Sequence, residues 1–296
     1  MRILAPLLLL WSGLLCAAEP VLSTDGSERS EEDVELPSGI EARLRQETSV
    51  ADNPFVILPH RPSYLLPLSY NRRPNLSNGV LSDGALDKTE IKFQFSFKLP
   101  VWKRPLGENS VLFFAYTQQS YWQAYNGAVS SPFRETNHEP ELILSFLTDY
   151  PVLGMRNRVV SFGLNHQSNG QSEALSRSWN RFYAQFVLER GSFALSFKSW
   201  LRFSESASED DNPDIEEFMG HGELAGLYRL GDQRLGWMLR GSTRHNHGAL
   251  QVDWTFPISS RAKGYVQYFE GYGESLIDYD HHNQRLSVGM LLADWL

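Results

Sequence analysis

A histidine, a serine and an asparagine lie close together in the stretch GLNHQSNGQSEALSRSWNRF, residues 163–182. A serine hydroxyl becomes a nucleophile when a base takes its proton, and an imidazole is the usual base. His166 and Ser168 are two residues apart, which is about 6.6 Å between Cα atoms in a strand, so the ring can reach the hydroxyl. An amide such as that of Asn180 can orient the ring through its other nitrogen. These residue types indicate acyl transfer through a covalent intermediate, although His-x-Ser alone is a common combination.

The same three residues continue the apolar faces of two predicted strands. Side chains two apart in a strand share a face. The apolar residues that share a parity with His166 and Ser168, or with Asn180, are Val160, Phe162, Leu164, Phe182, Ala184, Phe186 and Leu188. In a soluble protein this face would be the core, and three polar groups there would need hydrogen-bond partners. In a membrane barrel it would face lipid, and the three residues would lie where a lipid substrate arrives.

The length and hydropathy pattern of the whole chain narrow the fold class. The 296 residues suffice for one large domain or two small ones. After the first twenty residues, no apolar run is long enough for a transmembrane helix. A helical membrane protein is therefore excluded, whereas a barrel, whose strands alternate, remains allowed.

Residues 1–18, MRILAPLLLLWSGLLCAA, have the features of a secretory signal. They contain one basic residue, a leucine-rich centre and small residues at the end, which predicts cleavage after Ala17 or Ala18. Cys16 is the single cysteine of the chain, so the mature protein is expected to have no thiol and no disulfide. Acylation of Cys16 as in a lipoprotein would need a small residue before it, and Leu15 is not small.

The segment that follows, residues 19–53, is acidic, low in aromatic residues and without periodicity, which predicts a disordered N-terminal extension. One domain is expected over residues 54–296. The formal net charge of the chain is -8. An acidic exported chain is a poor candidate for binding nucleic acid.

Alternation of apolar and polar residues recurs along this domain. It is clearest in Glu90–Leu99, where Ile91, Phe93, Phe95, Phe97 and Leu99 alternate with Lys92, Gln94, Ser96 and Lys98. The predicted strands cover residues 63–70, 90–99, 111–125, 140–149, 158–166, 179–189, 192–203, 221–230, 235–242, 249–257, 263–272 and 284–296. An even number of such strands around a polar, charged interior is typical of outer-membrane barrels. The sequence therefore predicts an all-β fold, a twelve-stranded antiparallel transmembrane β-barrel.

The connections between these strands alternate in length. Residues 189–192, 231–234 and 257–262 form short links, whereas longer polar links cover residues 71–88, 126–138, 167–178, 204–219 and 273–283. This alternation predicts periplasmic turns at one end and external loops at the other. The stretch with the histidine and the serine is then expected at the external rim. Tryptophans near strand ends are expected in interfacial girdles, namely Trp102, Trp122, Trp179 and Trp295.

A tetrahedral intermediate also needs stabilisation of its oxyanion. The backbone amides of Asn169 and Gly170 follow the serine and are candidates for this role. Asn-Gly is equally typical of a simple turn, so both interpretations stay open. The sequence contains no Cys/His cluster with the spacing of a zinc site.

Several motifs together carry a resemblance to a known family. HQSNGQSEALSRSWNRF, YTQQSYWQAYN (116–126), SSPFRETNHEPEL (130–142), DDNPDI (210–215) and GYGESLIDYD (271–280) resemble bacterial outer membrane phospholipase A, with similarity from about Pro54 to the end. The resemblance implies a twelve-stranded barrel in the outer membrane of a Gram-negative-type bacterium, with a Ser-His-Asn triad on its outer face. It further implies phospholipase A1, phospholipase A2 and lysophospholipase activity on phospholipids, and activation by calcium-dependent homodimerisation.

The resemblance assigns roles to individual residues. Ser168 corresponds to the nucleophile, His166 to the base and Asn180 to the orienting residue. The calcium ligands of the family's dimer correspond to Ser130, the backbone carbonyl of Gln171, and Ser176, and a second calcium position includes Asp211. Oxygen ligands of this kind suit Ca²⁺. Gln118 corresponds to a glutamine buried at the family's dimer interface.

The chain departs from the family pattern at three positions near the site. Gln167 replaces an aspartate between the histidine and the serine, and its parity predicts that it points away from them. Gln171 replaces an arginine, which matters little if its carbonyl is the ligand. Glu173 replaces an aspartate near the calcium and is expected to alter calcium affinity.

Two other functions fit parts of the pattern. A non-catalytic porin or scaffold barrel would explain the alternation and the loops, but gives no reason for three polar residues on the lipid-facing side. A deacylase acting on lipopolysaccharide would share the geometry and differ in substrate.

Overall fold

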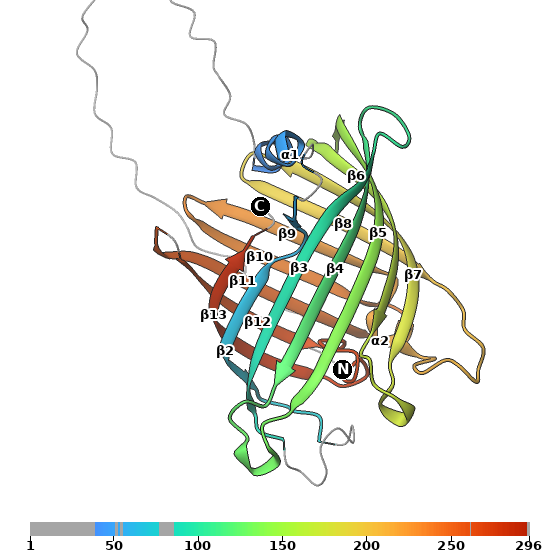
Figure 1. Cartoon of the computed structure of the whole chain (residues 1–296), viewed down its shortest axis with the longest axis vertical. Coiled ribbons are helices and arrows are strands. Elements are labelled where there is room, and N and C mark those ends of the chain that lie inside the picture. Colours follow the sequence, from blue (N-terminus) through green and yellow to red (C-terminus); the bar gives the residue numbers. More distant parts are fainter. Residues whose placement is uncertain (1–38, 51–52, 54–55, 77–85, 261, 295–296) are drawn as a thin grey trace, which may run out of the picture. The chain divides into compact units, whose positions relative to one another are not determined.

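Twelve antiparallel strands close into a β-barrel in the computed structural model, which describes residues 39–50, 53, 56–76, 86–260 and 262–294 (Figure 1). The strands are β2 (Ser63–Asn71), β3 (Thr89–Lys103), β4 (Ser110–Trp122), β5 (Phe133–Val152), β6 (Met155–Ser168), β7 (Ser178–Arg190), β8 (Phe193–Arg202), β9 (Gly222–Leu230), β10 (Gln233–Ser242), β11 (His247–Ser259), β12 (Ala262–Gly271) and β13 (Asn283–Ala293). Each strand pairs with the next, and β13 pairs with β2 to close the barrel. The two-residue strand β1 (Leu58–Pro59) pairs with β3 beyond the end of β2. The predicted fold class is confirmed.

The alternation in β3 shows which face of the sheet lies inside the barrel and which lies outside. Lys92 is 1% exposed inside the barrel, whereas Phe95 on the opposite face is 48% exposed. Apolar side chains thus cover the outside of the wall and polar ones face the interior, as in outer-membrane barrels. The outer face of the barrel therefore forms a lipid-facing surface.

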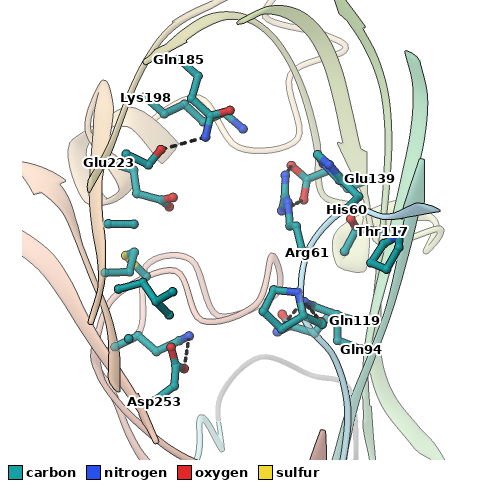
Figure 2. A pocket seen from close by; sticks show the side chains of 18 of the residues that line it. His60, Arg61, Gln94, Thr117, Gln119, Glu139, Gln185, Lys198, Glu223 and Asp253 are labelled. Atoms are coloured by element: carbon teal, nitrogen blue, oxygen red, sulfur yellow. Dashed lines mark hydrogen bonds and ion pairs between the residues drawn. The ribbon is translucent and has the colours of Figure 1, made fainter. Parts of the chain in front are cut away.

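Several buried charges inside the barrel form ion pairs. Lys92 and Arg285 both contact Glu274, which comes from the β12–β13 connection that folds back into the barrel. Burial raises the pKa of Glu274, but the attraction of Arg285 and Lys92 outweighs it and holds the pKa below the ordinary value. The interior also contains a cavity of about 440 Å³. Figure 2 shows Arg61, Glu139, Lys198 and other polar side chains that line it.

The two ends of the barrel differ. The long-loop end carries the connections β2–β3, β4–β5, β6–β7, β8–β9 and β12–β13 together with the short β10–β11 turn, and the short-turn end carries β3–β4, β5–β6, β7–β8, β9–β10 and β11–β12. At the long-loop end, helix α2 (Ile215–Met219) packs on β10 and β11. Its Ile215 and Met219 join an apolar cluster with Trp179, Trp200 and Leu276 beneath the loops. This cluster is the main apolar core of the described residues.

Helix α1 (Gly39–Val50) lies at the short-turn end (Figure 1). Its Ile40 amide donates to Glu189 Oε1 at 2.8 Å, and Ile40 packs against Val187 and Ala194. The helix lies within the range 19–53 that was expected to be disordered, because contacts with the barrel supply the stability that its own sequence pattern lacks. The predicted signal and residues 19–38 lie outside the described residues. Within the described ranges, no helix is long and apolar enough to cross a membrane.

Two sequence expectations differ from the structure. Trp179 is fully buried inside the barrel and not in an interfacial girdle, because it has the opposite parity to Asn180. Trp102 is 61% exposed on the outside, as a girdle residue would be.

β5 begins at Phe133 and not at residue 140, since its first residues are mostly polar and only their pairing with β4 marks them as strand. Trp295 lies outside the described residues.

Candidate active site

The histidine, serine and asparagine come together where β6 and β7 meet at the long-loop end. His166 is the direct cross-strand partner of Asn180, and Ser168 is the last residue of β6. His166 Nδ1 lies 2.8 Å from Asn180 Oδ1. A carbonyl oxygen only accepts, so the imidazole donates its Nδ1–H and leaves Nε2 as the basic nitrogen. The ring is therefore held in the tautomer that a general base needs.

The side chains on either side of these residues define the face. Phe162 and Leu164 on β6 and Phe182 on β7 are exposed on the outside of the barrel and share the parity of the three polar residues. Gln167 faces the interior, where its Oε1 accepts a hydrogen bond from Trp179 Nε1 at 2.9 Å. The candidate site thus lies on the outer face, separate from the interior cavity.

A second histidine borders the serine. His138 on β5 is the cross-strand partner of Ser168, and its Nδ1 lies 2.7 Å from the hydroxyl of Tyr116. Gly170 lies beside its Cδ2–Nε2 edge. Sequence reasoning missed His138 because it assigned residues 126–138 to a loop. In the described part of the chain the Ser168 hydroxyl makes no side-chain hydrogen bond.

The loop after Ser168 is braced by one buried side chain, that of Asn169. Its Oδ1 accepts from the amides of Gln171 and Arg177, and its Nδ2 donates to the carbonyl of Leu175. The sequence suggested the Asn169 amide as an oxyanion donor. That amide instead donates to the Arg177 carbonyl at 3.0 Å, so it is not available for this role. Gly170 has a φ of +64°, a conformation that favours glycine. Its N–H makes no hydrogen bond to any residue that the structure describes, which leaves it as the backbone donor next to Ser168.

Asn180 has a further partner that sequence reasoning also missed. Its Nδ2 donates to Glu205 Oε1 at 3.0 Å. The sequence contained a signal for this contact, because Glu205 has the same parity as Leu201 and Phe203. Leu201 lies in β8 and Phe203 directly follows it, and both are exposed on the outer face. The outer-face polar group therefore contains a carboxylate in addition to the predicted three residues.

The residues matched to calcium ligands are partly brought together. Ser176 donates its hydroxyl to Asp211 Oδ2 at 2.6 Å, which joins the β6–β7 loop to the β8–β9 loop. Gln171 is exposed in the same β6–β7 loop, and Ser130 lies in the β4–β5 loop with a φ of +64°. A carboxylate, hydroxyls and a carbonyl are ligands that Ca²⁺ accepts. Among the described residues, no group of three or more His, Cys, Asp or Glu could hold a metal ion.

A row of polar side chains extends from Ser168 across the outer wall. Gln118 on β4 is the cross-strand partner of His138, which in turn faces Ser168. Gln118 Nε2 donates to Ser120 Oγ at 3.2 Å, and Thr136 Oγ1 donates to the same oxygen at 3.1 Å. Polar side chains on a lipid-facing wall cost free energy, so their presence there indicates a role in binding or catalysis. We call these residues, Gln118, Ser120, Thr136 and His138, the outer polar row.

Comparison with known proteins gives a consistent result. The family model described as Phospholipase A1 matches residues 40–292. Phospholipase A1 from Salmonella typhimurium and from Escherichia coli K12 are each 41% identical over 247 residues, which covers 82% of this chain and 83% of theirs.

Two solved structures are also similar. A Salmonella typhi outer membrane phospholipase dimer with bound calcium is 39% identical with a TM-score of 0.78, covering 82% of this chain and 94% of that one. An active-site mutant of Escherichia coli outer membrane phospholipase A, in which an asparagine is replaced by alanine, is 40% identical with a TM-score of 0.78, covering 83% and 95%.

Proposed function

The chain belongs to the Phospholipase A1 family, and we propose that it hydrolyses acyl esters of phospholipids with Ser168 as nucleophile, His166 as base and Asn180 as orienting residue. It is a phospholipase, and its location is the outer membrane. The observation that carries the assignment of residues is the 2.8 Å contact between His166 Nδ1 and Asn180 Oδ1 on the lipid-facing wall, beside Ser168. The Escherichia coli relative supports it, since that active-site mutant is changed at an asparagine.

The mechanism follows from the tautomer of His166. Nε2 takes the proton of the Ser168 hydroxyl as its oxygen attacks the ester carbonyl, and the Gly170 amide donates to the resulting oxyanion. The imidazolium, stabilised through Asn180, then gives its proton to the departing lysophospholipid oxygen. In the second half water attacks the acyl-enzyme while His166 takes a proton from that water, and His166 then gives the proton to the Ser168 oxygen as the fatty acid leaves.

We assign calcium to the oxygen ligands around the loop that follows Ser168. The Salmonella typhi structure contains bound calcium. In this chain Ser130, the Gln171 carbonyl and Ser176 are the proposed ligands in the dimer, and Asp211 is a proposed ligand of a second position beside Ser176. The 2.6 Å contact between Ser176 and Asp211 supports this set, because it joins two oxygen ligands from different loops. Bound calcium would supply positive charge toward the oxyanion.

We propose a homodimer as the active form, with the outer polar row at its interface. The Salmonella typhi structure is a dimer. Gln118 lies in line with His138 and Ser168 on adjacent strands, so a second copy that covered Gln118 would also border the nucleophile. The acyl chain of the substrate would then lie between the two walls. Activity on both acyl positions and on lysophospholipids belongs to the same proposal.

A pore function is less well supported. The interior contains buried ion pairs such as Lys92–Glu274, and the polar residues of the outer face have no role in conduction. Lipopolysaccharide deacylation would use the same geometry, and an assay with glycolipid and phospholipid side by side separates the two substrates.

The direct test is fatty-acid release from phospholipid in detergent micelles, with wild type and Ser168→Ala, each with calcium and with chelator. Release should vanish with the substitution and with the chelator. Full activity of Ser168→Ala would refute the assignment of the nucleophile. If neither folded form releases fatty acid and purified protein conducts ions, the pore interpretation takes its place.

A further inference from the structure

We propose that Glu205 is a positioning residue of the active site, which orients Asn180 and places a negative charge behind the Asn180–His166 pair. The inference rests on the proposed triad. The proposed triad then becomes a chain of four hydrogen-bonding groups, in the order Ser168, His166, Asn180 and Glu205. The contact that carries it is the 3.0 Å hydrogen bond from Asn180 Nδ2 to Glu205 Oε1.

The position of Glu205 follows from the strand before it. The Phe203 amide donates to the Asn180 carbonyl at 2.9 Å, so the pairing of β7 with the β8 side continues past Arg202. Glu205 is two residues beyond Phe203 and emerges on the same outer face. The β8–β9 loop thus delivers a carboxylate to the end of the asparagine side chain.

The direction of each hydrogen bond then follows from the donor and acceptor capacities. An ionised carboxylate only accepts, so the Asn180 amide must turn its NH₂ toward Glu205. Its Oδ1 is consequently directed at His166, where the 2.8 Å contact requires an Nδ1–H donor. Nε2 is left unprotonated for the Ser168 hydroxyl. Without Glu205, nothing among the described contacts of Asn180 would distinguish its two ends.

The charge of Glu205 is not neutralised by a neighbouring cation in the part of the chain that the structure describes. Arg202, three residues earlier, pairs with Asp210 at 2.5 Å. Glu205 Oε2 is inaccessible to solvent and has no hydrogen-bond partner there. A carboxylate in this setting acts through the polarised amide on the imidazolium that forms during the reaction. The neutral asparagine then transmits part of the effect that an aspartate has in Ser-His-Asp enzymes.

The test uses full-length protein with calcium and compares Glu205→Gln, Glu205→Ala and the control Glu209→Gln. Glu209 is in the same loop and carries the same charge, but accepts its hydrogen bond from Ser206. Fatty-acid release gives kcat and KM, and kcat/KM is measured from acid to neutral pH. Altered gel mobility on heating shows that each variant is a folded barrel.

Glu205→Gln keeps an acceptor but loses the charge, so kcat should fall roughly tenfold with KM unchanged. The acid limb of the pH profile should move to lower pH, because the imidazolium loses a stabilising negative charge. Glu205→Ala should lower kcat further, since Asn180 is then free to turn. His138, the other titratable side chain facing Ser168, is measured as His138→Gln so that its titration is kept apart.

Folded Glu205 variants that behave like Glu209→Gln would overturn the proposal, and so would a loss of kcat with an unmoved acid limb. Ser168→Ala is measured in the same assay. If it is inactive while the Glu205 variants are unaffected, this proposal alone fails. If it is active, the triad itself fails.

Discussion

Gln167 stands between His166 and Ser168 on β6 and faces the opposite side of the barrel wall. The two reactive residues meet lipid, while Gln167 binds Trp179 in the interior. A single wall of sheet therefore separates the chemistry from the polar interior. The consequence is that substitutions one residue apart should have different effects.

Asn180→Ala should lower kcat about 10- to 100-fold, because the imidazolium loses a hydrogen bond to a fixed acceptor. Fatty-acid release in calcium-containing micelles measures this. Gln167→Asp is the matched control, since it changes the residue between His166 and Ser168 on the interior face and should leave kcat unaltered. Equal losses in the two variants would contradict the assignment of faces.

Alternation in the sequence was sufficient to predict that His166, Ser168 and Asn180 share the outer face. It would also have located Glu205 through Leu201 and Phe203, had the pattern been followed past the strand end. It could not predict that the Asn169 amide is already bonded to Arg177, because that contact depends on how the loop folds back. His138 was missed because polar residues conceal the start of β5.

The β6–β7 and β8–β9 loops meet beside the nucleophile through the contact between Ser176 and Asp211. This contact is where bound calcium should act. Asp211→Asn and Ser176→Ala each remove a proposed ligand oxygen or its charge. The calcium concentration for half-maximal activity should rise about tenfold or more in each, while activity at saturating calcium recovers. Glu209→Gln removes a carboxylate from the same loop and should leave the calcium requirement as in wild type. An unchanged requirement in Asp211→Asn would exclude it as a ligand.

Helix α1 is an element that the sequence pattern did not predict. Ile40 and Leu44 give only one apolar turn, and the contacts with Glu189, Val187 and Ala194 lie far away in the chain. Ile40→Ala should lower the free energy of opening of the helix by about 2 kcal/mol, since the side chain is buried. Native-state hydrogen exchange of the α1 amides measures that free energy.

Arg45→Ala is the control for α1. Its side chain is 70% exposed and pairs with Glu41 one turn away, so the change should stay within about 0.5 kcal/mol. If Ile40→Ala exchanged no faster than Arg45→Ala, the docking of α1 on the barrel would be refuted. The strands themselves were predictable because each has one apolar face, whereas α1 depends on contacts distant in sequence.

The outer polar row lies on the part of the outer wall formed by β4 and β5. A second copy is proposed to bind there. Gln118→Ala should weaken calcium-dependent dimerisation roughly three- to tenfold, as expected for one interfacial hydrogen bond in a membrane protein. Sedimentation equilibrium in detergent with calcium measures the dimer constant.

Gln284→Ala is the matched control for Gln118→Ala. Gln284 lies on β13, three strands from β4, and its amide bonds with Arg72 and Tyr268 away from the active site. Its removal should leave the dimer constant unchanged. If both glutamines weakened the dimer equally, the interface would not be the wall that carries Gln118.

The reactive serine is proposed to be Ser168, on the lipid-facing wall. Covalent labelling can identify the nucleophile without a substitution. Wild-type protein in micelles with calcium is treated with an alkylsulfonyl fluoride, and the modified peptide is identified by mass spectrometry. One adduct is expected, on Ser168, that blocks fatty-acid release and is suppressed by chelator and by His166→Ala. Blocked release with the adduct on another residue and Ser168 unmodified would show that Ser168 is not the nucleophile.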